Sequence, residues 1–328
     1  MDQPAVFQDR KPVRGSPIFW LRFLGIISFV IILLRLPTVG EVHLVHMDLR
    51  WLGFCMVLTL AQLLLEACVW QLLLWKQHIR HPYPKTLVAY LSGQYLGLVT
   101  PGHVGEFLAA GYISSETGIT MGYALSSVVM KKVLNWVTIM AYGIWSFPLL
   151  ADLPIGKGIQ WILVTSAVVL MVLSLGILLW VVSLRRLARK WQKLSPWQVD
   201  ITEFWSGIRH LTTPSLLRPL IVSATAFSIL FLQLWSVLHA LGVSLPFLLI
   251  AKIVAFSRIV ARAGPLSVVG FGSKDAVIIG VLAQHGLDPA VGLTVTLLLL
   301  VSSYLITLLL SGLCWWIKPL MVRRVTSG

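Results

Sequence analysis

Hydrophobic residues follow one another along this chain in six uninterrupted stretches, each long enough to cross a bilayer as a helix. The stretches cover about residues 18–36, 50–75, 121–147, 158–183, 216–241 and 289–317. Two further apolar segments, 86–115 and 246–284, are interrupted by glycine and proline, and their pieces of about 12 to 18 residues suit re-entrant half-helices. The pattern predicts an all-α, polytopic helical membrane protein with about six full spans plus two re-entrant broken-helix hairpins. If each interrupted segment formed two full spans instead, the total would be ten.

The composition supports this class and excludes others. Of the 328 residues, 57% are hydrophobic and only 12% are charged, whereas soluble domains are about a quarter charged. A soluble enzyme, a disordered chain and a fibrous chain are therefore excluded. We expect a cytoplasmic N-terminus at 1–17, a single transmembrane domain at 18–317 and a cytoplasmic C-terminus at 318–328. No small-x-small cleavage site follows the first apolar stretch, so we expect it to remain as a span.

The net charge of +14 arises from 26 Lys and Arg against 12 Asp and Glu. Seventeen of these bases lie in the segments 1–22, 76–85, 184–218 and 318–328. The alternate loops 37–48, 148–157 and 242–246 contain only one, Lys157. Because cytoplasmic loops carry an excess of Lys and Arg, we expect both termini on the cytoplasmic side. The aromatic and basic loop 184–215 is typical of an interfacial segment on an anionic leaflet, so the charge indicates membrane topology and no nucleic-acid partner.

The two interrupted segments resemble each other at an offset of 168 residues. Gly118-Ile119-Thr120 aligns with Gly286-Leu287-Asp288, and the glycine loop at Gly102 and Gly105 falls beside the one at Gly270 and Gly272. Each loop is followed closely by an acid, Glu106 or Asp275. An odd number of spans separates the two units, so they face opposite ways. The sequence therefore predicts an inverted-topology repeat, with repeat 1 at about 86–147 and repeat 2 at about 246–317.

Two motifs in these loops resemble those of a known family. Pro101-Gly102-His103-Val104-Gly105-Glu106 is similar to the P-G-R-x-G-E motif of the lysylphosphatidylglycerol synthase transmembrane-region family of flippase-like integral membrane proteins. Residues 265–275, PLSVVGFGSKD, resemble its second signature, a Pro and a Ser followed by G-G-x-G-x-R-E. The resemblance covers nearly the whole chain. It implies the movement of anionic or amino-acylated lipids between leaflets, as in the lipid-flipping domain of the multiple peptide resistance factor.

The chain departs from the family pattern at charged positions. His103 stands in place of the Arg of the first motif, and Lys274-Asp275 stands in place of R-E in the second. An E-R-x-x-D-like stretch of the family corresponds here to KKVLN at residues 131–135. These differences concern the substrate more than the fold. The family's soluble aminoacyl-transferring domain has no counterpart after Trp316, so we expect lysyl-lipid synthesis to need a separate soluble synthase.

We expect nine ionisable residues of these segments to lie within the hydrocarbon region, where charges are costly and mark a site or a pathway. They are Glu66, Glu106, Lys131, Lys132, Lys252, Arg258, Arg262, Lys274 and Asp275. Six are bases and three are acids, which favours an anion, and the abundant membrane anion is the phosphate of a lipid headgroup. We assign substrate binding to Lys131, Lys132, Arg258, Arg262, Lys274, Gly102, Gly105, Gly270 and Gly272. We assign coupling or charge pairing to Glu66, Glu106 and Asp275.

Structural alternatives exist for these charges. Adjacent helical residues point about 100° apart, so we expect one of Lys131 and Lys132 to face the cavity while the other pairs elsewhere, with Glu66 as a candidate. The alternative is a pair of internal salt bridges that hold the bundle together. Arg258 and Arg262 share a helix face at i, i+4 and either bind phosphate or cap the carbonyls of the broken helix. Glu106 and Asp275 are expected at the N-termini of short helices, where exposed N–H groups favour a carboxylate.

Taken together, the sequence predicts a lipid flippase or transporter of the plasma or inner membrane that moves an anionic, phosphate-bearing lipid and is not an enzyme. One alternative is a lipid-modifying membrane enzyme with Glu106 or Asp275 as base. Another is a non-transporting subunit that docks a soluble synthase at 184–215. We expect no cofactor, and the His43-x-x-His46-x-Asp48 pattern has too few ligands for a metal site.

Overall fold

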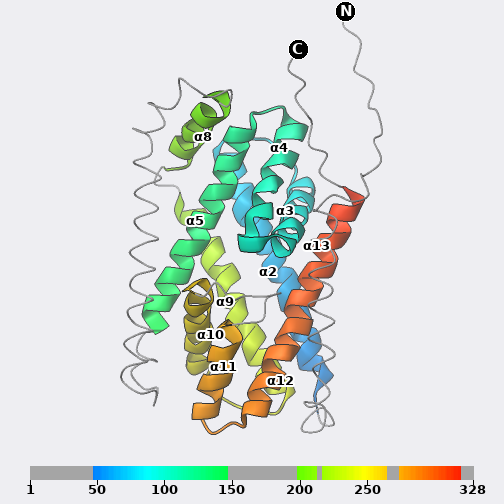
Figure 1. Cartoon of the computed structure of the whole chain (residues 1–328), viewed down its shortest axis with the longest axis vertical. Coiled ribbons are helices and arrows are strands. Elements are labelled where there is room, and N and C mark those ends of the chain that lie inside the picture. Colours follow the sequence, from blue (N-terminus) through cyan, green and yellow to red (C-terminus); the bar gives the residue numbers. More distant parts are fainter. Residues whose placement is uncertain (1–46, 147–197, 213–215, 264–272, 319–328) are drawn as a thin grey trace, which may run out of the picture.

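A computed structural model describes residues 47–146, 198–212, 216–263 and 273–318, and within these ranges the chain forms helices and no strands (Figure 1). Four long apolar helices confirm four of the six predicted stretches. They are α2 (Leu49–Lys76), α5 (Met121–Ser146), α9 (Leu217–Ala240) and a rod from Pro289 to Ile317. The predicted spans 18–36 and 158–183 lie outside the described residues.

The first interrupted segment folds into a helical hairpin. It consists of α3 (Tyr83–Val99), the 3-10 helix η2 (Pro101–Leu108) and α4 (Ala109–Thr117). The predicted break falls at Thr100, whose backbone is extended, but a 3-10 helix follows where the sequence led us to expect an open glycine loop. His81, just before α3, lies 3.2 Å from Glu116, near the end of α4. The hairpin therefore begins and ends at the same end of the molecule.

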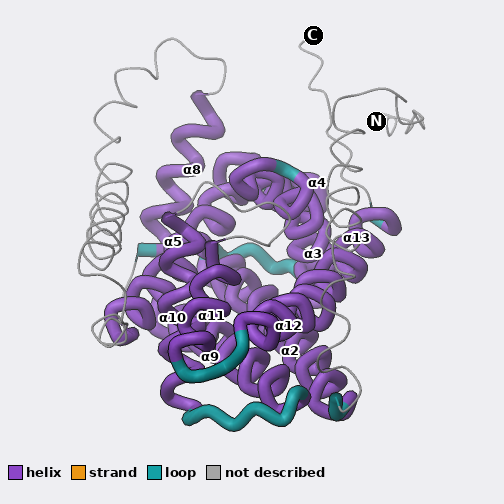
Figure 2. Tube along the Cα trace, turned by 60° about the horizontal axis from the view of Figure 1, so that its bottom comes forward, coloured by secondary structure: helices purple, strands orange, loops and turns teal. Residues whose placement is uncertain are grey.

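The second interrupted segment forms a matching hairpin at the opposite end, which lies at the bottom of Figure 1. It consists of α10 (Phe247–Ala263) and α11 (Ser273–Gln284), and the predicted glycine break between them lies outside the described residues. Helices α3 and α10 both have 17 residues. Figure 2, turned so that this end comes forward, shows the short loop that leads from α11 into the rod.

Each hairpin has its own apolar core. Around the first, buried side chains of α2, α3, α4 and α5 pack together, among them Trp70, Ala89, Ile113 and Val128. Around the second, buried side chains of α9, α10, α11 and the rod pack together, among them Leu234, Ile253, Leu282 and Val295. Helices α2 and α5 contribute to both cores, through Cys55 and Ile139 in the second case. The long helices thus join the two hairpins into one bundle.

The rod consists of α12 (Pro289–Leu299), the π-helix η5 (Leu300–Leu305) and α13 (Ile306–Ile317). The π-turn changes the carbonyl pattern at Ser302, and the Thr59 hydroxyl of α2 donates to the Ser302 carbonyl at 3.1 Å. Gln233 of α9 donates to the Thr59 hydroxyl at 3.1 Å. A buried polar network therefore joins α2, α9 and the rod where one helix departs from α geometry.

The basic loops gather at one end of the molecule, which we call the basic end. Lys76 donates to the Leu211 carbonyl of α8 (Gln198–Leu211), and Lys318 at the end of α13 reaches Glu116. The opposite end holds the loops 241–246 and 285–288, which contain neither Lys nor Arg. The described loops thus fall on the two ends as the charge pattern predicts.

Candidate ion-pair and anion site

Adjacent lysines in the middle of α5 bind two different elements. The Lys131 ammonium lies 2.6 Å from the carboxylate of Glu66 on α2, and the Lys132 ammonium lies 2.6 Å from the carboxylate of Glu106 on η2. The pairing predicted for one of the two lysines with Glu66 is confirmed, and that lysine is Lys131. The expectation that the other lysine stays free to face a cavity is wrong, because adjacent helical side chains diverge and Lys132 finds its own acid.

Aromatic rings complete both pairs. The Lys131 ammonium lies 4.4 Å from the centroid of Tyr90, and the Lys132 ammonium lies 5.1 Å from that of Phe107, so each cation faces the negative side of a ring. Gln94 donates to the Tyr90 hydroxyl at 2.9 Å. The sequence gives no direct signal for these contacts, because the rings come from α3 and η2 while the lysines come from α5.

Two glycines on α3 make room for Glu106. A Cβ at Gly93 would lie 2.6 Å from the Cβ of Ala109, and one at Gly97 would collide with the side chain of Glu106. Gly93 and Gly97 are four residues apart and form a G-x-x-x-G pattern, which lets helices approach closely in membranes. This pattern is readable in the sequence and could have indicated that η2 packs against α3.

Gly105 packs closely against the end of α3. Its N–H donates to the Thr100 hydroxyl at 2.8 Å, and a Cβ there would collide with the Leu96 carbonyl. Gly105 is thus required by close backbone packing, and its N–H is not directed at a phosphate. Gly102 lies in the same 3-10 helix, whereas Gly270 and Gly272 lie outside the described residues.

The position of Glu106 is also corrected. It is the sixth residue of η2, which continues directly into α4, so its carboxylate is held by Lys132 instead of by a helix N-terminus. Asp275, in contrast, lies in the first turn of α11 as predicted, and its side chain is only 4% exposed. Glu106 is therefore stabilised by an ion pair and Asp275 by its position at a helix N-terminus, although both follow corresponding loops.

The second hairpin carries a different balance of charge. Lys274 lies 3.9 Å from Asp275 and within the electrostatic field of Arg258 on α10. Arg262 is one turn beyond Arg258 on α10, and its side chain is outside the described residues. Around the first hairpin two lysines face two glutamates, whereas α10 and α11 hold four bases, including Lys252, and one acid. The excess positive charge therefore belongs to the second hairpin.

The two charge groups lie at different levels along the bundle axis. Gly143 of α5 lies against Ile259 of α10, and the two helices run in opposite directions (Figure 1). With a rise of about 1.5 Å per residue, Lys132 lies about 16 Å from Gly143 towards the basic end, and Ala263 lies about 6 Å from Ile259 in the same direction. Helix α10 thus ends roughly 10 Å short of Lys132 along the axis.

An apolar groove of about 400 Å³ opens between α5 and α9. It is lined by Val137, Thr138, Ala141, Tyr142, Trp145, Leu220 and Ala224. Its hydroxyls are satisfied within the protein, since Thr138 donates to the Leu134 carbonyl at 2.9 Å and Tyr142 lies 2.7 Å from Ser228. The groove offers no charge to a headgroup and is suited to hydrocarbon.

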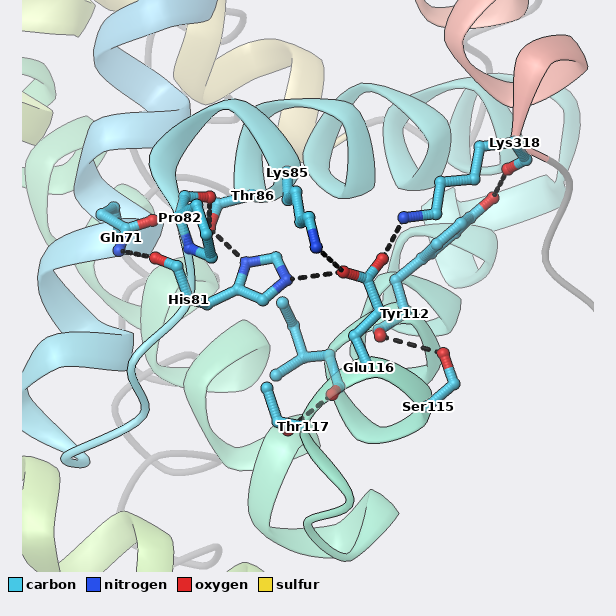
Figure 3. Close-up of polar contacts among 11 residues, drawn as sticks. Gln71, His81, Pro82, Lys85, Thr86, Tyr112, Ser115, Glu116, Thr117 and Lys318 are labelled. Carbon is cyan, nitrogen blue, oxygen red and sulfur yellow. Dashed lines mark hydrogen bonds and ion pairs between the residues drawn. The ribbon is translucent and has the colours of Figure 1, made fainter. Parts of the chain in front are cut away.

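A second ionic cluster lies at the basic end, and the sequence did not lead us to expect it (Figure 3). The Glu116 carboxylate of α4 accepts hydrogen bonds from Lys318 and His81 and lies 3.8 Å from Lys85. Burial raises the pKa of Glu116, but the hydrogen bonds from Lys318 and His81 outweigh it and hold this pKa below its ordinary value. Glu116 therefore fastens the end of α13 to both ends of the first hairpin.

A family model described as Lysylphosphatidylglycerol synthase TM region matches residues 19–311. The chain belongs to this family. The match includes both hairpins and all four long apolar helices of the described part, except the last turns of the rod. It establishes a multi-pass helical membrane protein of a lipid-related family. Comparisons with curated proteins and with solved structures find no match to the chain.

Proposed function

We propose that the protein is a lipid flippase or transporter that moves an anionic, phosphate-bearing lipid between the leaflets of the plasma or inner membrane. The observation that carries this proposal is the excess of bases on α10 and α11, within the apolar body of the bundle. Four bases and one acid there leave a positive site that a phosphate oxyanion neutralises. Arg258 and Lys274, which lie within each other's field, are the described groups that would contact it.

The arrangement of the hairpins supports an inverted-topology repeat of two re-entrant units. Gly118 and Gly286 both have positive φ, 74° and 82°, in the turn that ends each unit. The helix after each turn begins at Met121 or Pro289, again at the offset of 168 residues. The hairpins enter from opposite ends, and in transporters built this way the site lies where the broken helices meet near the midplane.

In this mechanism the headgroup enters between the hairpins while its acyl chains stay in the bilayer. Rocking of one hairpin against the other then exposes the headgroup to the other leaflet. We propose movement without chemical change, because both candidate bases are engaged by cations. Glu106 binds Lys132 and Asp275 lies beside Lys274, and a carboxylate held by a cation is a weak general base. The charge pattern of the loops supports cytoplasmic termini.

Liposomes containing the purified protein and a fluorescent phosphatidylglycerol test this proposal. Dithionite quenches the outer leaflet, so lipid movement is measured as the fraction quenched with time. We expect the wild type to equilibrate the leaflets and the double variant Arg258→Gln, Lys274→Met to slow this at least tenfold. Lys85→Met, which removes an exposed base at the basic end, is the matched control. Equal rates in the double variant, or a new lipid product in mass spectra, would contradict the proposal.

A further inference from the structure

We infer that Glu106 is an internal stand-in for the substrate phosphate, and that the incoming headgroup displaces its carboxylate from Lys132. This inference rests on the proposed function and adds to it a specific first contact and a specific competitor. Lys132 would then be part of the anion site only after its ion pair opens. Lys131 and Glu66 would stay paired throughout.

The two pairs differ in how accessible they are. Side chains of Lys131 and Glu66 are 13% and 15% exposed, whereas those of Lys132 and Glu106 are 26% and 21% exposed. Tyr90, which lies over Lys131, is itself buried. A ligand that approaches this group of charges therefore reaches Lys132 before Lys131.

The element that carries Glu106 is suited to local movement. Helix η2 is a 3-10 helix of eight residues, longer than most of this type, and its hydrogen bonds have poorer geometry than those of an α-helix. The Glu106 side chain rests against Gly97, which has no side chain to confine it. Helix α4, in contrast, is fixed by buried Ala110 and Ile113. The carboxylate can thus leave Lys132 while the hairpin core stays in place.

Exchange of the Glu106 carboxylate for a phosphate also avoids a state in which Lys132 is buried without a counter-charge. A lysine left without a partner inside the bundle carries a large desolvation penalty, so an empty site with a bare Lys132 would be unstable. Glu106 removes that penalty until a phosphate takes its place. The released carboxylate stays on η2 beside the ion pair of Lys131 and Glu66, and the excess of bases lies on α10 and α11.

Binding measurements on the full-length protein in an uncharged detergent test the inference. The probes are dihexanoyl phosphatidylglycerol and, separately, inorganic phosphate, which distinguishes a lipid headgroup from any phosphate. For the lipid, we expect Glu106→Gln to lower Kd about tenfold, because Lys132 loses its competitor, and Glu106→Asp to give a smaller gain. A gain for the lipid alone would identify the ligand as a lipid headgroup, and a gain for both probes would identify a general phosphate site.

Two further variants locate the effect. The double variant Glu106→Gln, Lys132→Met should lose the gain entirely, and Glu66→Gln should gain at least fivefold less than Glu106→Gln. Glu116→Gln, which removes an acid of the same hairpin at the basic end, is the control for a change in net charge. Melting temperatures confirm that each variant is folded, and Glu106→Asp keeps the test valid if Glu106→Gln is not.

The inference fails if neither Glu106 variant binds either probe more tightly than the wild type, or if the gain survives Lys132→Met. These results are separate from those of the liposome assay. Tighter binding by Glu106→Gln without lipid movement by the wild type would leave the anion exchange standing and overturn the flippase proposal. Lipid movement by the wild type without any gain in binding by the Glu106 variants would overturn the anion exchange and leave the flippase proposal standing.

Discussion

The hydroxyl of Thr59 donates to the carbonyl of Ser302 at 3.1 Å and so fastens α2 to the one π-helical turn found in the described helices. A π-turn leaves carbonyls without their usual helical partners, and each needs another donor when it is buried. Ser302 is fully buried, and so is Thr59 apart from 1% of its surface. The Thr59 hydroxyl also lies 3.0 Å from the Cys55 carbonyl of its own helix, so its single proton is shared between α2 and the irregular turn.

Thr59→Val should lower the free energy of unfolding by about 1–2 kcal/mol, because the substitution removes a buried hydroxyl that contacts the Ser302 carbonyl and accepts a hydrogen bond from Gln233. The shape of the side chain is kept, so packing changes little. Unfolding by denaturant in detergent micelles measures the difference. Thr225→Val is the matched control, since the Thr225 hydroxyl is exposed and bonds only to Ile221 of its own helix. An equal effect of both substitutions would contradict this role of Thr59.

Gly93→Ala should destabilise the first hairpin by about 1–3 kcal/mol, because the new Cβ would lie 2.6 Å from Ala109 and force α4 away from α3. Thermal unfolding in detergent measures the loss. Gly53→Ala is the control, since a Cβ there meets nothing within 4 Å and alanine favours a helix. If both alanine variants unfold at the wild-type temperature, the close contact between these helices is not needed.

Glu66→Gln removes the carboxylate that neutralises the mostly buried Lys131 and should cost about 3–5 kcal/mol of stability. The double variant Glu66→Gln, Lys131→Met removes both charges and should recover most of that loss. A double-mutant cycle with Lys131→Met alone gives the coupling energy. A coupling near zero would show that the 2.6 Å contact contributes nothing to stability.

Glu116 should make stability depend on pH in acid. Its pKa is lowered from an ordinary value of 4.5, so its contribution is complete above about pH 4.5 and is lost as the pH falls through the folded-state pKa. Melting temperatures of the wild type and Glu116→Gln should therefore differ at pH 7 and converge once the pH falls below the folded-state pKa of Glu116. A gap that stays the same at every acidic pH at which the wild type still unfolds cooperatively would contradict an ionic role for Glu116.

Features that depend on a local pattern of residues could be predicted from the sequence alone. Apolar run length located α2, α5, α9 and the rod, and Thr100 was recognisable as a break because a Pro-Gly pair follows it. The distribution of Lys and Arg placed the described loops on two ends. The pairing of Lys131 with Glu66 was also foreseeable, since a buried base needs an acid and few acids were present.

The remaining features depend on packing between distant elements. Nothing local to Glu116 shows that His81 and Lys318, 35 and 202 residues away in the sequence, will meet it. The close packing of η2 on Gly93 and Gly97 of α3 joins two elements that the sequence does not show to be in contact. The glycines of the first loop looked like phosphate ligands because glycine is also common in such loops, but the N–H of Gly105 is used by Thr100.

One face of helix α2 makes polar contacts with both the rod and α5. Thr59 holds the rod, and Glu66, seven residues and about two turns further on, holds α5 through Lys131. A displacement of the rod relative to α5 must therefore break one of these bonds or carry α2 along with one side. Because the ion pair between Glu66 and Lys131 is proposed to stay closed, α2 moves together with α5, and the hydrogen bond from Thr59 to Ser302 is the contact that a displacement of the rod breaks.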